Sequence, residues 1–284
     1  MEPFPISHHD NGLQLLFLQK WMSQFSWLTV GFTTRHGGSS TGNYESLNCG
    51  LHVGDMQEDV VMNRVKVAEQ LRFPFSYFTC AEQVHGNQVA VVNEHNRGSG
   101  KDSLHDVIAG VDAIVTNVPN VLLASFYADC VPLFIIDPVH KVVGLAHAGW
   151  KGTCLNIAQN TVNTMNEHFG TDASECVAAI GPSIGGCCYE VGKEVCEQIK
   201  LTCTDEKLIQ NEIIKEQLSG KYHINLKEMN RQIMMKVGIL PNNIETSSWC
   251  TLCRSDLFFS YRQNNVTGRM MSWIGLQGER MFTG

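Results

Sequence analysis

Two apolar runs on either side of one Asp-Pro pair place the strongest limit on how this chain folds. Residues 131–136 read Val-Pro-Leu-Phe-Ile-Ile, residues 142–147 read Val-Val-Gly-Leu-Ala-His, and Asp137-Pro138 lies between them. Apolar runs of this length bounded by turn residues are typical of buried strands, and Asp followed by Pro favours a turn. We therefore predict an antiparallel hairpin whose turn is centred between Pro138 and Val139.

The two ends of this predicted hairpin carry side chains that can bind a metal. In the predicted register Cys130 lies directly opposite His147, and such pairs have Cβ atoms roughly 4.5 to 5.5 Å apart. A thiolate and an imidazole at that distance can share one Zn²⁺. The segment Gln83-Val84-His85-Gly86 precedes another apolar run and offers His85 as the third ligand. Three protein ligands leave one position for water, as in catalytic zinc sites.

Two other interpretations of Cys130 and His147 stay open on spacing alone. In one, His147 lowers the pKa of a nucleophilic Cys130 while Asp129 or another carboxylate orients the ring, which predicts a cysteine hydrolase or deamidase. In the other, Cys130 is an ordinary buried thiol and His147 is a core histidine with satisfied hydrogen bonds.

The rest of the chain predicts a sheet-rich α/β or α+β protein. Further strands are expected at 27–33, 88–92, 113–116, 122–126, 176–180, 258–261 and 269–274, and a loop at 93–106. Helices are expected at 59–71, 151–169, 191–200 and 226–237. Helices do not alternate with strands one for one, which favours a sandwich over a barrel of βα units. No linker divides the chain, so we expect one domain over residues 1–284.

Composition limits the classes of function. A hydrophobic content of 43% is typical of a globular protein, and a formal net charge of −7 gives no general attraction to nucleic acid or anionic lipid. No secretory signal or membrane-length apolar run is visible, so we expect a cytoplasmic protein. The odd number of cysteines, 11, favours free thiols over a disulfide framework.

Several short motifs together resemble one known family. They are Thr34-Arg35-His36-Gly37-Gly38, Ser46-Leu47-Asn48, Gln83-Val84-His85-Gly86, Ala128-Asp129-Cys130-Val131-Pro132, His147-Ala148-Gly149-Trp150-Lys151-Gly152-Thr153, Gly181-Pro182-Ser183-Ile184 and Phe259-Ser260-Tyr261-Arg262. The chain resembles the laccase-domain family, once called multicopper polyphenol oxidases and now understood as purine nucleoside phosphorylases. The resemblance covers about residues 31–274 and is strongest to the bacterial single-domain type.

The resemblance implies a fold, an ion and an activity. The implied fold is a single domain with a central β-sandwich-like core flanked by helices. One zinc is implied at His85, Cys130 and His147. The implied activity is phosphorolysis of adenosine, inosine, guanosine and S-methyl-5'-thioadenosine, together with deamination of adenosine. The older name implies a copper-dependent polyphenol oxidase, which needs many histidine ligands, whereas only His85 and His147 occupy matching motifs here.

Substrate and proton-transfer residues are expected around this site. Arg35, Lys151 and Arg262 are candidates for binding phosphate, and Asn48 is expected to bind substrate. Asp129 is a candidate for moving a proton, alongside catalytic roles for Cys130 and His147. Expected partners are a purine nucleoside and phosphate, without nucleic acid or membrane, and a homo-oligomer is compatible with the sequence.

Other cysteines carry a weaker signal. Cys250-Thr-Leu-Cys253 is a single C-x-x-C without a second pair, so we do not expect a structural zinc there. Cys187-Cys188 is expected to remain as two thiols.

Overall fold

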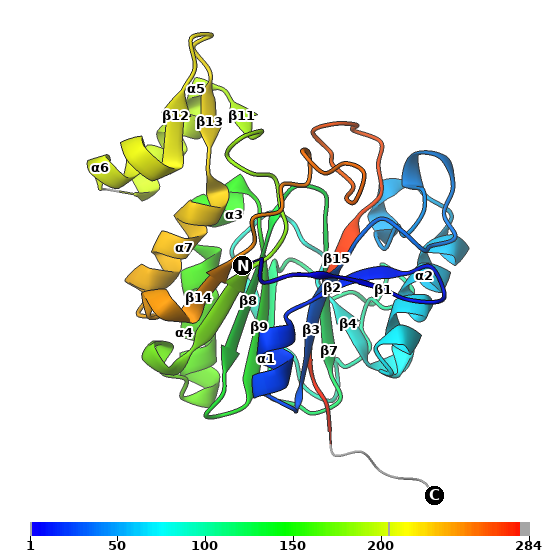
Figure 1. Cartoon of the computed structure of the whole chain (residues 1–284). Coiled ribbons are helices and arrows are strands. Elements are labelled where there is room, and N and C mark those ends of the chain that lie inside the picture. The colour runs from blue at the N-terminus through cyan, green and yellow to red at the C-terminus, as the bar shows by residue number, and fades with distance from the viewer. Residues whose placement is uncertain (1, 204, 279–284) are drawn as a thin grey trace, which may run out of the picture.

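The apolar strands form two six-stranded sheets (Figure 1). The computed structural model describes residues 2–203 and 205–278. The first sheet has the order β1 (Ile6–His8), β2 (Gln14–Phe17), β3 (Leu28–Thr33), β15 (Met270–Leu276), β7 (Leu122–Tyr127), β4 (Phe78–Cys80). The second has the order β14 (Ile244–Thr246), β10 (Val177–Ile180), β8 (Val131–Asp137), β9 (Val142–Ala148), β6 (Ala113–Thr116), β5 (Val89–Val91).

Smaller elements surround the two large sheets. A three-stranded sheet has the order β11 (Glu190–Val191), β13 (Tyr222–Ile224), β12 (Ile214–Glu216). The α-helices are α1 (Gln19–Gln24), α2 (Gln57–Gln70), α3 (Trp150–Cys154), α4 (Ile157–Phe169), α5 (Lys193–Thr202), α6 (Glu206–Leu208) and α7 (Leu226–Lys236). A π-helical turn spans Ile209–Ile213, and 3-10 turns span Gly42–Tyr44, Leu51–Val53, Phe75–Tyr77, Ala173–Glu175 and Pro241–Asn243.

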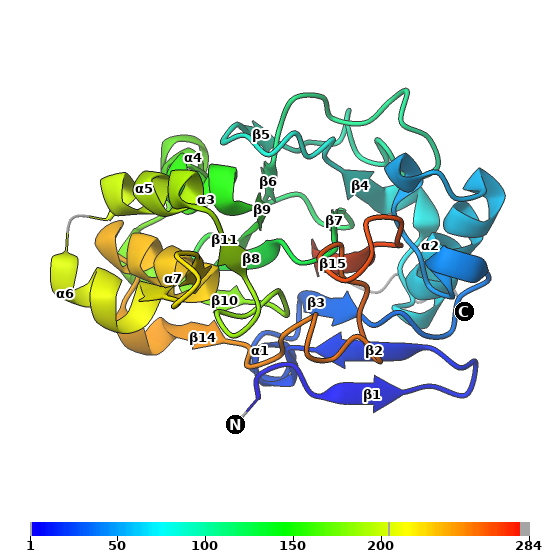
Figure 2. The same ribbon diagram turned by 90° about the horizontal axis from the view of Figure 1, so that it is seen from above.

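The longer helices α2, α4 and α7 lie on the outer faces of the paired sheets, as Figure 2 shows from above. α4 and α7 cover the second sheet and α2 covers the first, so the order of layers is helix, sheet, sheet, helix. Alternate residues of β8 point to opposite sides: Phe134 and Ile136 pack between the sheets, whereas Leu133 and Ile135 pack under the helices. Both faces are therefore buried, which explains why these antiparallel strands read as continuous apolar runs. The predicted sandwich core flanked by helices is confirmed.

Three sequence expectations about individual elements are wrong. Residues 258–261 form an irregular loop rather than a strand, and Phe258 and Phe259 supply core side chains from it. The predicted helix at 151–169 is two helices, since Asn156 has the left-handed φ of 59° that asparagine tolerates. The helical spacing of Leu155 from Ala158 and Val162 predicts that one continuous helix would bury it, but Leu155 is 50% exposed at this break.

The hairpin of β8 and β9 forms as predicted, but its register differs by two residues. Asp137 pairs with Val142 and Pro132 pairs with His147, so Asp137 ends the strand and the loop spans 138–141. The Asp137 carboxylate accepts hydrogen bonds from the backbone N–H groups of Val139 and His140 at 2.8 and 3.1 Å. Because Asp137 caps the turn in this way, the loop is longer than the turn predicted from the sequence.

Among the described residues, no helix combines the length and the apolar character needed to cross a membrane.

Candidate metal centre

Three side chains from separate parts of the chain converge beside the second sheet. His85 lies in the loop that leads to β5, Cys130 in the connection from β7 to β8, and His147 in β9. One donor atom from each lies within 4.8 Å of the others. The Cys130 Sγ atom is 3.9 Å from His85 Nε2, and the two imidazole rings are nearly perpendicular, with centroids 4.8 Å apart. The predicted grouping is confirmed, and it could hold a metal ion.

The route by which Cys130 reaches His147 differs from the one predicted. Because His147 pairs with Pro132, Cys130 is its diagonal neighbour on the same face of the sheet rather than its direct partner. Continuing the register by two residues places Gly149 opposite Cys130. A Cβ atom at Gly149 would lie 3.0 Å from His85 Cδ2 and 3.2 Å from Cys130 Sγ. The absence of a side chain at Gly149 therefore makes room for two of the donors.

Asp112, which the sequence analysis missed, orients both histidines. Its Oδ1 atom is 3.0 Å from His147 Nδ1 and accepts a hydrogen bond from the backbone N–H of His85 at 2.9 Å. Its Oδ2 atom accepts from the backbone N–H of Gly86 at 2.6 Å. A proton on His147 Nδ1 leaves Nε2 free to bind a metal, the arrangement that carboxylates impose on histidine ligands. The only signal in the sequence was a carboxylate directly before a buried strand.

The electrostatics of the centre favour a thiolate. Burial raises the pKa of Cys130, but the charge of His147 and hydrogen bonds with His147 and His85 lower it to about 6. Burial lowers the pKa of His147, but Cys130 and Asp112 raise it to about 9. Between these values the metal-free centre holds a thiolate beside an imidazolium. His147 is 3% exposed whereas His85 is exposed, so the centre opens on the His85 side.

These two pKa shifts have opposite effects on stability as the pH changes. The folded pKa of Cys130 is below its ordinary value of 9.0, so its stabilisation is present at high pH and is lost as the pH falls through about 6. The folded pKa of His147 is above its ordinary value of 6.5, so its stabilisation is present at low pH and is lost as the pH rises through about 9. Both contributions stabilise the fold, and between about pH 6.5 and pH 9 one grows as the other declines, so we expect their sum to change little with pH there.

The reactivity of Cys130 provides a direct test. In metal-free protein, alkylation of Cys130 by iodoacetamide should rise with a midpoint near pH 6. In His147→Gln the midpoint should move above 9, because burial then acts without the cation. Peptide-level mass spectrometry across this pH range measures both midpoints, with Cys154, whose pKa burial raises, as an internal control. A wild-type midpoint near 9 would contradict the thiolate–imidazolium pair.

Asp129 precedes Cys130 in a strained backbone conformation, with φ of 89°. Its carboxylate accepts hydrogen bonds from Thr251 Oγ1 at 2.6 Å, Ser260 Oγ at 3.0 Å and the backbone N–H of Arg262 at 2.7 Å. These bonds tie the loop that carries Cys130 to the segment 251–262.

Arg35 and Asn48, both expected to bind substrate, lie on the first-sheet side of the centre. The Arg35 guanidinium donates to the carbonyl oxygens of Glu45 and Ser255 and stacks on Phe259. It lines a cavity of about 410 Å³ together with Ser260, which contacts Asp129. Asn48 is fully buried and accepts from the backbone N–H of Arg269 at 2.8 Å.

The other two expected substrate residues lie at the surface. Lys151 is exposed in the first turn of α3, four residues after His147. The Arg262 guanidinium donates to the carbonyl of Glu190 and lies over the ring of Tyr189. Within the described residues, neither the Lys151 ammonium group nor the Arg262 guanidinium group contacts any of the three donor atoms.

Arg269 is a further residue that the sequence analysis did not assign to the site. It is partly buried, and the charges of Cys130 and Asp129 act on its guanidinium, so it lies near the centre. Burial nevertheless lowers its pKa overall. Its Nη1 atom donates to the carbonyls of Thr267 and Gly268, and within the described residues its Nη2 and Nε atoms donate to no protein group. Two donors thus stay available to an anion.

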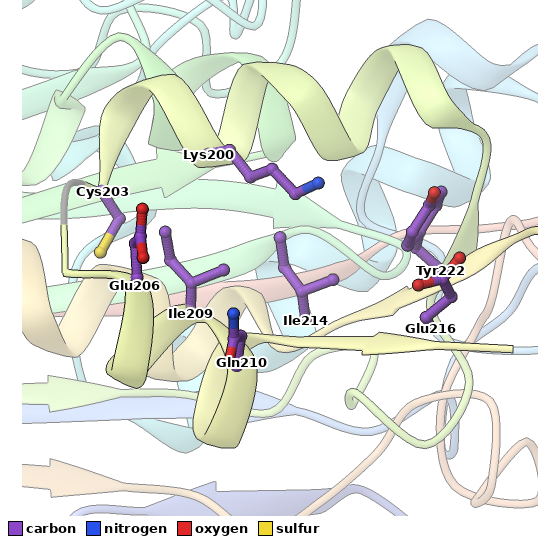
Figure 3. Close-up of a pocket in the computed structure, with 8 residues that line it drawn as sticks. All are labelled: Lys200, Cys203, Glu206, Ile209, Gln210, Ile214, Glu216 and Tyr222. Carbon is purple, nitrogen blue, oxygen red and sulfur yellow. The ribbon is translucent and has the colours of Figure 1, made fainter.

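A larger cavity lies away from this centre. It has a volume of about 700 Å³ and lies between α5 and the β12–β13 hairpin (Figure 3). Its lining includes Lys200, Glu206, Glu216 and Tyr222, and no residue of the metal centre takes part.

Comparison with known proteins supports a family assignment. The model of the family described as multi-copper polyphenol oxidoreductase laccase matches residues 29–277. This chain belongs to that family.

Characterised relatives cover nearly the whole chain. "Purine nucleoside phosphorylase YlmD" of Bacillus subtilis is 42% identical over 249 residues, which span 87% of this chain and 88% of that protein. The protein of the same name from Geobacillus stearothermophilus is 41% identical over 256 residues, spanning 90% of this chain and 92% of that protein. The crystal structure of YlmD from Geobacillus stearothermophilus matches with a TM-score of 0.91 at 38% identity, covering 98% of this chain and 100% of that one.

Proposed function

We propose that this protein is a purine nucleoside phosphorylase built around a metal ion bound by His85, Cys130 and His147. The observation that carries the proposal is the convergence of these three donors, in a chain 42% identical to a protein named purine nucleoside phosphorylase. The proposed substrates are phosphate with adenosine, inosine, guanosine or S-methyl-5'-thioadenosine. Deamination of adenosine at the same centre is proposed as a second activity.

The donor set fits Zn²⁺ better than copper. One thiolate, two imidazoles and an open fourth position form a common tetrahedral zinc set. Of the eleven histidines, His85 and His147 are the two that belong to a candidate metal group, too few for the several coppers of a laccase. A bound Zn²⁺ supplies Lewis acidity, which polarises a substrate or water oxygen.

The protein side chains then have to bind phosphate and move a proton. In phosphorolysis a phosphate oxygen forms a bond to the anomeric carbon of the ribose, the bond from that carbon to the purine nitrogen breaks, and the purine takes up a proton. We propose that Arg269 binds the phosphate with its two available donors, and that Arg35, Asn48, Lys151 and Arg262 complete the substrate site. Asp129, held beside Cys130 by three hydrogen bonds, is the proposed proton-transfer group.

The role of Arg269 predicts a change in the KM for phosphate. Arg269→Met keeps the apolar stem that packs against Gly50 but removes the charged donors. Losing hydrogen bonds to a charged ligand costs roughly 1.5 to 3 kcal/mol, so the KM should rise on the order of tenfold to a hundredfold. Arg254→Met is the matched control, because Arg254 is a partly exposed arginine paired with Asp256 and is not part of the proposed phosphate site. An unchanged phosphate KM in Arg269→Met would remove Arg269 from the proposal.

A panel of nucleosides tests the function itself. The zinc-loaded protein is incubated with each nucleoside with and without phosphate, and the products are identified. Ribose 1-phosphate formed only with phosphate supports phosphorolysis, and inosine formed from adenosine supports deamination. A full panel left unchanged would refute the proposed function.

The second candidate function is a cysteine hydrolase, favoured by the thiolate–imidazolium pair of Cys130 and His147. It predicts an active metal-free protein that alkylation of Cys130 inactivates. Activity that is lost on zinc removal and returns with zinc would exclude it.

A further inference from the structure

Four cysteines outside the metal centre come together in the folded chain. Cys187 and Cys188 are adjacent in one loop, and Cys250 and Cys253 form a C-x-x-C about sixty residues later. Their four sulfur atoms all lie within 4.8 Å of one another. The Cys253 sulfur is 3.3 Å from that of Cys188 and 3.6 Å from that of Cys187. The second cysteine pair that the C-x-x-C lacked in the sequence is therefore supplied by the fold.

Backbone hydrogen bonds hold the two cysteine loops side by side. Ser183 forms a parallel bridge with Cys250, and the N–H of Thr251 donates to the Ser183 carbonyl at 3.1 Å. A Cβ atom at Gly185 would lie 3.3 Å from the Cβ atom and 3.5 Å from the sulfur of Cys250, so a glycine there lets the two loops approach. The main chain thus holds the two loops that carry the four cysteines close together.

The distances fit a single tetrahedral ion. With Zn–S bonds of about 2.3 Å, the sulfur atoms of a regular tetrahedron lie about 3.8 Å apart. A disulfide requires about 2.05 Å between sulfurs, and all four cysteines are free thiols. In an iron–sulfur cluster the four cysteines are divided among two or four irons, so their sulfur atoms cannot all lie this close together. The geometry therefore matches one mononuclear site with four sulfur ligands.

We propose that Cys187, Cys188, Cys250 and Cys253 bind a second, structural zinc ion. Four protein ligands leave no open position, which separates this site from the three-ligand centre. One sulfur already accepts a backbone hydrogen bond: the N–H of Gly185 donates to the Cys250 sulfur at 3.2 Å. The buried Lys227 ammonium donates to the carbonyls of Ser247 and Trp249, which places a cation next to the segment that carries Cys250.

The proposed ion would fasten the loop containing Tyr189 and Glu190 to the segment 250–262. That segment carries Thr251, Ser260 and Arg262, which bind the Asp129 carboxylate beside Cys130. The structural zinc would thereby fix one wall of the catalytic centre without touching a substrate.

Metal counting on the full-length protein tests the proposal independently of enzyme activity. Inductively coupled plasma mass spectrometry should find two zinc ions per wild-type chain. The double variant Cys187→Ser, Cys253→Ser should retain one, and so should His85→Ala, because each removes a different site. Cys203→Ser, which changes a partly buried cysteine outside the cluster, should retain two.

X-ray absorption on the His85→Ala protein identifies the ligands even if the double variant fails to fold. The remaining zinc should have four sulfur neighbours and no nitrogen neighbour. One zinc per wild-type chain, lost completely in His85→Ala, would refute the second site. A disulfide between Cys253 and either Cys187 or Cys188 in a non-reducing peptide map would also refute it. If two zinc ions are bound but no nucleoside is consumed, the proposed function fails while the second site stands.

Discussion

Replacing Asp112 with asparagine is expected to weaken zinc binding at the proposed centre of His85, Cys130 and His147 by roughly 10- to 100-fold, the usual effect of losing a carboxylate behind a histidine ligand. Both Asp112 oxygens accept hydrogen bonds, from His147 Nδ1 and the backbone of His85 on one side and from the backbone of Gly86 on the other. Asparagine replaces one of these two oxygens with an NH₂ group, which would then face an N–H donor instead of accepting a hydrogen bond from it. The loop holding His85, the ring of His147, or both then lose their positions.

Asp137→Asn is a close control for Asp112→Asn. Asp137 is also fully buried at an end of β8, and it accepts hydrogen bonds from two backbone N–H groups and from His140 Nδ1. Both variants leave a buried donor unsatisfied, at a cost of about 1 to 3 kcal/mol in the free energy of unfolding. Only Asp112→Asn should lower the zinc affinity, measured by competition with a chromogenic chelator. Equal zinc affinities in the two variants would show that Asp112 has no special role.

Adding one methyl group at Gly149 is expected to remove zinc from the catalytic centre and abolish turnover. The Cβ atom of alanine would approach His85 Cδ2 to 3.0 Å and Cys130 Sγ to 3.2 Å, so both ligands must move apart. The backbone itself tolerates alanine, because φ is −70° and ψ is 175° at this position. The effect is therefore steric and local to the metal ligands.

Gly192→Ala is the matched control for Gly149→Ala. Gly192 precedes α5 as Gly149 precedes α3, with nearly the same dihedral angles of −79° and 175°, and a Cβ atom there meets nothing within 4 Å. The control should bind zinc and turn over substrate as the wild type does, with unchanged or slightly raised stability. Wild-type zinc content and activity in Gly149→Ala would show that the centre adapts to the added methyl group, against this prediction.

The strands of the core could be predicted from the sequence because both of their faces are buried. The predicted runs at 113–116, 122–126, 131–136 and 142–147 match β6 to β9 to within one residue at each end. Short strands such as β1 and β11 were missed, because they carry few apolar residues and depend on pairing partners. Residues 258–261 were misassigned for the opposite reason, since a core-facing loop has the same composition as a strand.

The three candidate metal ligands were grouped correctly from the sequence, although one step toward that grouping was incorrect. The register error was two residues, so Cys130 stayed on the same face as His147 and remained within reach. An error of one residue would have placed the two side chains on opposite faces. Asp112 could not be found in the same way, because a single carboxylate before a strand has no distinctive pattern.

The four-cysteine cluster shows where local spacing stops being informative. A metal site with two ligands in each of two loops can be recognised only when both pairs have a familiar spacing. Here one pair is a C-x-x-C and the other is adjacent, and about sixty residues separate them. The backbone bridge between Ser183 and Cys250 joins the loops, and no residue pattern announces that bridge.

The central claim is that metal bound by His85, Cys130 and His147 supports phosphorolysis of purine nucleosides. The most direct measurement is a zinc titration of metal-free protein in the presence of inosine and phosphate, with hypoxanthine and ribose 1-phosphate both quantified. We predict equal amounts of the two products, rising with zinc until the catalytic centre is filled, and none from Cys130→Ser. Hypoxanthine released equally well without phosphate, or no product at any zinc level, would contradict the claim.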